Sequence, residues 1–247
     1  MKKIKFISFS DLHVNEWRLS YKYDGDRLQD SIEAFRIIKR RAREMKVPML
    51  FSGDFVHQPR SISNEALDII SQELEDIGTP LIGIDGNHDQ AKANTHKNIS
   101  PGYFKSLGRM VKGVICVNQK PYLYGDTMIH GIPYMKHNVG FKTYLKKAEA
   151  SRVKFPQFKH VLLIHTDLPG ANSGHGHIIE SVDNLNMRRL KRFHLVLCGH
   201  IHIPQVIANN IIMVGAPYQQ NIGEVGEDKG YWEIYEDFTY KIGRAHV

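Results

Sequence analysis

The sequence has few of the features that mark a secreted, membrane-bound or disulfide-stabilised protein. It has two cysteines, Cys116 and Cys198, which lie far apart and outside any CxxC pair. They imply neither a disulfide framework nor a thiolate zinc site. No apolar run approaches the length of a membrane-spanning helix, and the apolar stretch near the N-terminus is too short for the core of a signal peptide. We therefore expect a cytoplasmic protein with no membrane partner.

Positive charge and histidine, in contrast, are abundant. The formal net charge is +7 and the pI is near 9.3, which suits a polyanionic partner. The densest basic clusters are Lys39–Arg41 with Arg43, and Arg188–Arg189 with Lys191–Arg192. Both fall on expected helices, and we interpret them as solvated helix faces rather than as DNA contacts. The chain also has fourteen histidines, whose placement is more informative than their number.

Apolar patterning predicts that strands and helices alternate along the chain. Short apolar runs predict strands at 3–10, 48–52, 81–85, 161–165 and 195–198. Apolar side chains at three- and four-residue spacing predict helices at 27–45, 67–77 and 139–151, with another near 183–192. Short strands with turns are expected at 111–133 and 205–240. This order predicts one α/β domain with mixed sheets.

A cluster of Asp, Asn or His residues follows almost every apolar strand. The clusters are SDLH (10–13), GDFVH (53–57), GNHD (86–89), IHTD (164–167) and CGHIH (198–202). A single Asp or His at such a position is usually a cap or turn residue. Because ligands of open α/β sheets gather at the carboxyl ends of strands, five such clusters point to one shared site.

The clusters contain seven side chains that could bind metal ions. Seven ligands are too many for one tetrahedral zinc, but they suit two ions that share a bridge. In extended backbone, residues i and i+2 project to the same side, so we expect Asp11 and His13 to face one ion together. Asp54 can offer two oxygens and so bridge the ions. The seven predicted ligands are Asp11, His13, Asp54, Asn87, His165, His200 and His202.

A site built mainly from histidines keeps a positive charge and favours a phosphate-like substrate. Two divalent ions contribute +4 and the two aspartates −2 before hydroxide binds. Bound ions lower the pKa of a bridging water, so that hydroxide can attack phosphorus near neutral pH. His88, next to Asn87, is expected to point toward the substrate as general acid or transition-state stabiliser. This reasoning leaves His57 without a role.

These motifs, spanning residues 11–202, resemble the calcineurin-like metallophosphoesterase superfamily. The resemblance implies a β-sandwich of two mixed sheets flanked by helices, with two divalent metal ions. It also implies how the ligands divide. Asp11, His13, Asp54 and His202 would hold one ion, and Asp54, Asn87, His165 and His200 the other.

Two further stretches resemble the SbcD-type, or Mre/Rad-type, DNA repair nucleases within that superfamily. GDFVH has a histidine where protein phosphatases typically have VDRG, and VGAPYQQNIGEVGEDKGYWEI (214–234) is similar to the segment after the last metal motif of these nucleases. The resemblance implies manganese-dependent exonuclease and endonuclease activity on DNA, a homodimer and a coiled-coil ABC ATPase partner of the SbcC type. His57 would help to position the DNA strand. Phage recombination nucleases belong to the same group. The alternatives are a phosphatase or cyclic-nucleotide phosphodiesterase of the same fold, and a non-catalytic scaffold.

Other residues have weaker indications. The glycine-rich segment NSGHGH (172–177) follows His165, so His175 and His177 either touch substrate or belong to a plain loop. Trp17, Tyr21 and Tyr23 either shape a DNA groove, form a dimer contact or cover the core. Five histidines lie outside any motif and receive no role: His96, His130, His137, His160 and His194.

The last six residues, IGRAHV (242–247), match the translation of a widely used sequencing adapter. We expect the phosphoesterase domain to occupy residues 1–241, with a non-native tail after it. The native protein would then continue into DNA-capping and ATPase-binding regions that are missing here.

Overall fold

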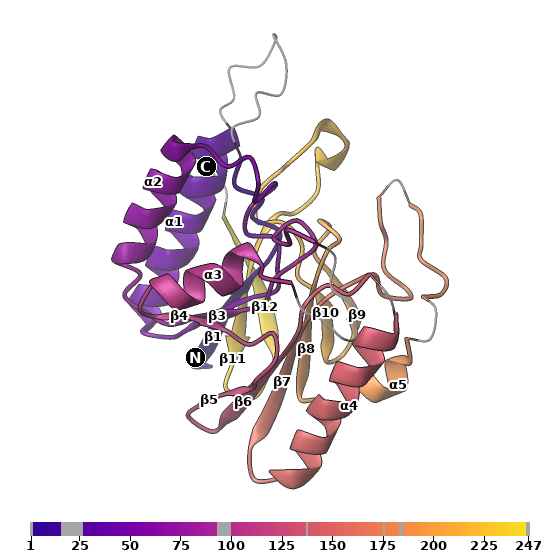
Figure 1. The fold of residues 1–247 in the computed structure, drawn as a ribbon. Helices are drawn as coiled ribbons and strands as arrows, with labels where there is room; N and C mark the ends of the chain where they lie inside the picture. The colour runs from indigo at the N-terminus through magenta and orange to yellow at the C-terminus, as the bar shows by residue number, and fades with distance from the viewer. Residues whose placement is uncertain are drawn as a thin grey trace.

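The structure is a computed structural model that describes residues 2–15, 27–92, 100–136, 138–174, 176–182 and 185–245. Two six-stranded sheets pack face to face, and helices cover their outer faces (Figure 1). This arrangement confirms the predicted α/β sandwich of two mixed sheets with flanking helices. Among the described residues, no helix has the length and apolar character needed to cross a bilayer.

The first sheet has the strand order β12-β11-β1-β2-β3-β4. Its strands are β1 (Ile4–Phe9), β2 (Met49–Phe51), β3 (Leu81–Gly83), β4 (Val114–Cys116), β11 (Gly230–Tyr235) and β12 (Tyr240–Arg244). Strands β1 to β4 are parallel, and β11 and β12 extend the sheet in antiparallel pairing. The three parallel strands β1, β2 and β3 therefore end at one edge, from which the first three predicted motifs emerge.

The second sheet has the strand order β5-β6-β7-β8-β10-β9. Its strands are β5 (Tyr122–Tyr124), β6 (Thr127–Ile132), β7 (Lys159–His165), β8 (Leu195–Gly199), β9 (Gln205–Ala208) and β10 (Ile211–Met213). Strands β6, β7, β8 and β10 are parallel, while β5 and β9 are antiparallel edge strands. His165 and Gly199 are register partners at the ends of β7 and β8, so the last two motifs leave this sheet side by side.

The helices lie on the two outer faces of the sandwich (Figure 1). They are α1 (Arg27–Met45), α2 (Asn64–Glu75), α3 (Tyr103–Met110), α4 (Asn138–Lys154) and α5 (Met187–Leu190), with a 3₁₀ turn, η1, at Ile222–Glu224. Helix α2 begins before its predicted start because Ser63 caps it, accepting a hydrogen bond of 3.0 Å from the Ala66 N–H. The helix expected near 183–192 is a single turn that begins after Asn186, and residues 183–184 lie outside the described part of the chain.

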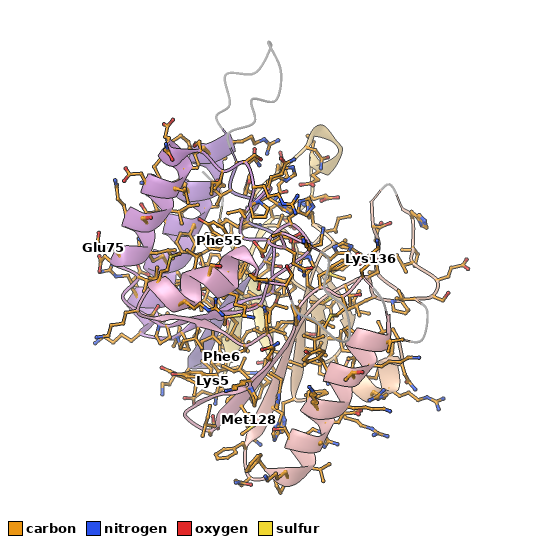
Figure 2. The ribbon with its side chains drawn as sticks, viewed as in Figure 1. Lys5, Phe6, Phe55, Glu75, Met128 and Lys136 are labelled. Atoms are coloured by element: carbon orange, nitrogen blue, oxygen red, sulfur yellow. The ribbon has the colours of Figure 1, made fainter. Side chains whose placement is uncertain are left out.

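Apolar side chains fill both faces of the central strands. In β1, Phe6 packs between the two sheets, whereas Ile7 and Phe9 pack beneath the helices of the first sheet. Leu197 and Cys198 of β8 alternate in the same way between the inner core and the core beneath α4 and α5. Strands buried on both faces read as continuous apolar runs, as the sequence does here. Phe6 lies low between the sheets in Figure 2, while Phe55 lies higher, near the strand ends.

The C-terminal strand crosses the domain boundary expected at residue 241. In β12, Ile242, Gly243 and Arg244 are register partners of Trp232, Tyr231 and Gly230 in β11. Residues 246–247 lie outside the described part of the chain. The adapter origin of the tail, and the missing regions beyond it, stay predictions.

Candidate metal centre

Hydrogen bonds between loops bring the five motifs together above the strand ends. The loop after β1 continues the pairing with β2, because Asp11 N–H donates to Gly53 O at 2.9 Å and His13 N–H to Asp54 O at 3.0 Å. The second sheet joins through His200 N–H, which donates to the Asp11 carboxylate at 3.1 Å. Gly86 allows the β3 loop to approach, since a Cβ there would overlap the Asp54 carboxylate. The site therefore lies between the two sheets.

Four predicted ligands have left-handed backbone conformations. The φ angles are 52° at Asp11, 46° at His13, 63° at Asp54 and 101° at His200. The expectation that Asp11 and His13 share a side because their backbone is extended is therefore wrong, since β1 ends at Phe9. The loop instead turns sharply, and that turn brings the two side chains together. Non-glycine residues in this region cost about 1–2 kcal/mol each and cluster at functional sites.

The first group of candidate ligands contains Asp11, His13 and His202, whose potential ligand atoms all lie within 4.8 Å of one another. His13 Nε2 also lies 3.5 Å from Asp54 Oδ2. This nitrogen is buried and has no hydrogen-bond partner among the described residues. Buried nitrogens are normally paired, so an orphaned imidazole nitrogen facing carboxylates fits a metal ion.

The second group contains Asp54, His165 and His200, again with potential ligand atoms within 4.8 Å of one another. Asn87 Oδ1 lies 2.9 Å from both His165 Nε2 and His200 Nδ1. His165 Nε2 is 3.1 Å from Asp54 Oδ2. Asp54 Oδ2 thus stands between the two groups, where a bridging carboxylate would stand. These two groups coincide with the division of ligands that the family resemblance implies, and the ligation itself stays a prediction.

Two more histidines form the rim of the site. His13, His57 and His88 make a third group with ring nitrogens within 4.8 Å, and the rings of His57 and His88 stack at 4.9 Å. His88 Nδ1 lies 2.8 Å from the His57 carbonyl oxygen, which can only accept. His88 Nδ1 therefore carries a hydrogen, and Nε2 holds a transferable proton when the ring is doubly protonated. Both rings are half-buried.

Charges in the site are balanced by one strongly basic histidine. Burial alone would lower the pKa of His165, but the carboxylates of Asp54 and Asp11 outweigh burial and raise it to about 9. His165 in turn holds the pKa of Asp54 below its usual range in spite of burial. Burial and the neighbouring His165 lower the pKa of His200 to about 4. A metal ion bound here would take the place of the His165 proton.

Asp89 is a supporting residue that the motif reading did not assign. It is fully buried, and its carboxylate accepts hydrogen bonds from the backbone N–H groups of Asp54 at 2.8 Å and Gly86 at 2.9 Å. It also accepts from Phe55 and Val56 at 2.8 and 3.1 Å. Asp89 thus ties the β2 loop to the β3 loop. Its place in GNHD was a signal, but its role depends on contacts 33–35 residues away in the chain.

The remaining predicted residues lie at the edge of the site or outside the described chain. A cavity of about 410 Å³ beside His200 and His202 is lined partly by Ser173 and Gly174 of the glycine-rich segment. His177 is exposed and does not line this cavity. Four residues with suggested roles lie outside the described residues: His175, Trp17, Tyr21 and Tyr23.

The first basic cluster is paired with acidic side chains, and in the second cluster Arg189 is paired. Lys39 and Arg41 contact Glu73 and Glu233 at 2.5 and 2.7 Å. Arg189 contacts Glu149 at 2.5 Å. These contacts agree with the interpretation of the clusters as helix faces.

Comparison with known proteins identifies the family. The model of the calcineurin-like phosphoesterase family matches residues 4–204. The uncharacterised protein R555 of Acanthamoeba polyphaga mimivirus is 24% identical over 261 residues, covering 95% of this chain and 18% of that protein. The SbcD component of the SbcCD nuclease of Staphylococcus saprophyticus is 21% identical over 257 residues, covering 94% of this chain and 66% of that protein. The chain thus spans a small part of the viral protein and just under two thirds of the nuclease component.

A solved crystal structure has a fold similar to that of this chain. It superposes with a TM-score of 0.57 over 99% of both chains, at 11% sequence identity. The family match covers all five strand-end motifs, whose side chains meet in one buried cluster suited to divalent ions. The chain belongs to the calcineurin-like phosphoesterase family.

Proposed function

We propose that this phosphoesterase is a DNA nuclease that hydrolyses phosphodiester bonds at DNA ends, in repair or recombination. The observation that carries the proposal is the position of His57. It is half-buried at the rim, its Nδ1 lies 3.4 Å from His13 Nδ1, and its ring stacks on His88. A residue placed there contacts the substrate side of the centre rather than completing either group of ligands. Similarity to proteins named as components of SbcCD nucleases supports this interpretation.

The residues of the site have separate roles in the proposed hydrolysis of a phosphodiester. Two divalent ions, held by the seven predicted ligands, would supply Lewis acidity and a hydroxide nucleophile at neutral pH. His88, oriented by the His57 carbonyl, donates a proton from Nε2 to the leaving oxygen. His57 contacts the phosphate of the bound strand and orients it toward His88. Burial and the neighbouring His88 lower the pKa of His57, which therefore acts as a neutral hydrogen-bonding group at pH 7.

We further propose manganese as the working metal, a homodimer as the nuclease unit and a coiled-coil ABC ATPase of the SbcC type as the partner. These proposals rest on the resemblance to SbcD-type nucleases. The net charge of +7 is favourable for binding DNA. The bacterial or phage-infected cytoplasm is the proposed location.

One substrate comparison tests the nuclease proposal. With Mn²⁺, the chain is expected to degrade linear duplex DNA, and His57→Ala is expected to lose exonuclease activity while retaining both ions. Cyclic nucleotides, phosphopeptides and a chromogenic phosphodiester are the comparison substrates. Hydrolysis of the small substrates without any DNA cleavage would refute the nuclease while leaving the phosphoesterase in place.

A further inference from the structure

We propose that Glu224, itself held by the buried Lys229, positions His202 for metal binding. Glu224 lies 22 residues beyond His202, in the η1 turn between β10 and β11. This inference rests on the part of the proposed function that concerns metal binding, and not on DNA as the substrate.

The contact between the two residues determines which nitrogen of His202 can bind a metal. Glu224 Oε1 lies 3.0 Å from His202 Nδ1. An ionised carboxylate only accepts hydrogen bonds, so Nδ1 must carry the hydrogen. The lone pair is then on Nε2, the nitrogen left to bind an ion. A carboxylate on the second nitrogen fixes the tautomer and ring orientation of a metal-binding histidine.

Two further hydrogen bonds and one ion pair hold the Glu224 carboxylate in place. Gln220 N–H donates to Oε2 at 2.9 Å, Asn221 Nδ2 to Oε1 at 2.6 Å, and Lys229 Nζ lies 3.1 Å from Oε2. Glu224 is 6% exposed. With four partners and little exposure, the carboxylate cannot rotate away from His202 without leaving buried donors unpaired.

Lys229 is the most unusual member of this arrangement because its side chain is fully buried. Its ammonium donates to the His202 carbonyl oxygen at 2.7 Å, and it lies 2.8 Å from Glu227 Oε2 and 3.1 Å from Glu224 Oε2. One hydrogen bond and two ion pairs thus surround the ammonium, and a buried charge needs such partners. Lys229 contacts both the backbone of His202 and the carboxylate that orients its ring.

The other histidine of the same motif has a weaker counterpart. His200 Nε2 lies 3.6 Å from Asp167 Oδ1, and the Asp167 side chain is 51% exposed. Of the two histidines of this motif, only His202 therefore has a buried carboxylate on its second ring nitrogen, and His202 belongs to the group with Asp11 and His13. This asymmetry predicts that loss of Glu224 weakens one of the two metal sites and not the other.

Titration of metal-free protein with Zn²⁺ against a chromophoric chelator tests this prediction. In Glu224→Ala, one of the two ions is expected to bind about 10–100-fold more weakly, with the other little changed. Glu224→Gln keeps a carbonyl acceptor for Nδ1–H and is expected to retain most of the affinity. Glu227→Ala is the matched control, because it removes a Lys229 partner without touching a histidine.

A second variant and a spectroscopic measurement distinguish the loss of this contact from misfolding. Glu224→Ala with Lys229→Met leaves no unpaired ammonium and is expected to show the same loss at one site. In ¹⁵N-histidine spectra of the zinc-loaded protein, His202 is expected to bind through Nε2 in the parent and to lose that single state in Glu224→Ala. Equal weakening of both ions, a Gln variant as weak as Ala, or unchanged His202 signals would overturn the proposal. Absence of DNA cleavage by the parent would not bear on it.

Discussion

Histidines lie at or beside both ends of strands β7 and β8, and their partners differ between the two ends. At the carboxyl ends, His165 and His200 face Asn87 Oδ1, and His165 also faces the Asp54 carboxylate. At the amino ends, His160 and His194 contact each other, because the His160 N–H donates to His194 Nδ1 at 3.0 Å. We call this second set, His130, His160 and His194, the basal histidines.

The basal histidines form a self-contained chain of hydrogen bonds. His130 Nε2 lies 2.9 Å from His160 Nδ1, and His160 Nε2 lies 2.9 Å from the Phe155 carbonyl oxygen. Within the described chain, their ring nitrogens have no carboxylate partner, and His130 and His160 are buried. Neutral rings satisfy every one of these contacts. Clustered histidines alone therefore do not make a metal site, which also needs ring nitrogens without other hydrogen-bond partners.

The largest effect should come from the histidine at the carboxyl end of β7. His165→Ala removes a ligand and the partner of Asp54, so we expect the loss of one ion and a fall in phosphodiester hydrolysis of roughly 10³-fold, or several kcal/mol. Elemental analysis and turnover of a chromogenic diester measure both. A variant with full metal content and normal turnover would show that His165 is not a ligand.

His88 should affect turnover without affecting the metals. We expect His88→Gln to keep both ions and to lower kcat about 10²–10³-fold, because Gln cannot donate a proton to the leaving oxygen. The stacked His57 is the matched control: His57→Gln should leave hydrolysis of the small diester nearly intact. Equal losses in both variants would remove the distinction between acid and substrate-positioning residue.

At the amino end of β7 the effect should be on stability alone. His160→Gln breaks the chain from His130 to the Phe155 carbonyl, and we expect about 1–3 kcal/mol less free energy of unfolding. Urea denaturation measures this loss, while metal content and turnover stay at parent values. A fall in activity comparable with that of His165→Ala would abolish the contrast between the two ends.

The effect that is smallest at neutral pH is a pH dependence of stability. Burial, together with His160, lowers the pKa of His130 to about 4, below an unfolded value of about 6.5. In this interval the unfolded chain binds more protons, so stability is full above about pH 6.5 and falls by about 1 kcal/mol per pH unit toward pH 4. Denaturation of parent and His130→Phe at several pH values tests this. An unchanged slope in the variant would assign the dependence to other groups.

The sequence predicted best those candidate ligands that closely follow a strand end. Asp54 and Asn87 follow β2 and β3 within a few residues, so parallel pairing alone brings them together. Their exact backbone could not be predicted, because left-handed φ values at Asp11 and His13 arise from hydrogen bonds to the β2 loop. Helix α3 was missed because its buried face consists of only Phe104 and Leu107.

The contacts of His202 with residues distant in the sequence could not be predicted from the motifs. Glu224 and Lys229 occur in a stretch rich in Gly, Glu and Asp, which locally reads as a turn. Only the path of the chain from β10 to β11 brings them to His202. The division into two sheets was likewise implied by resemblance alone, since apolar runs show burial but not which neighbouring strand a strand joins.

The left-handed residues bear on any attempt to transplant this centre. Grafting the seven side chains onto an idealised α/β scaffold would remove the left-handed turn that sets the positions of Asp11 and His13 in this structure. The unit to copy is the strand end together with its turn, including the Asp89 carboxylate that holds two loops at once. The geometry of the candidate metal centre therefore depends on backbone conformation as much as on residue type.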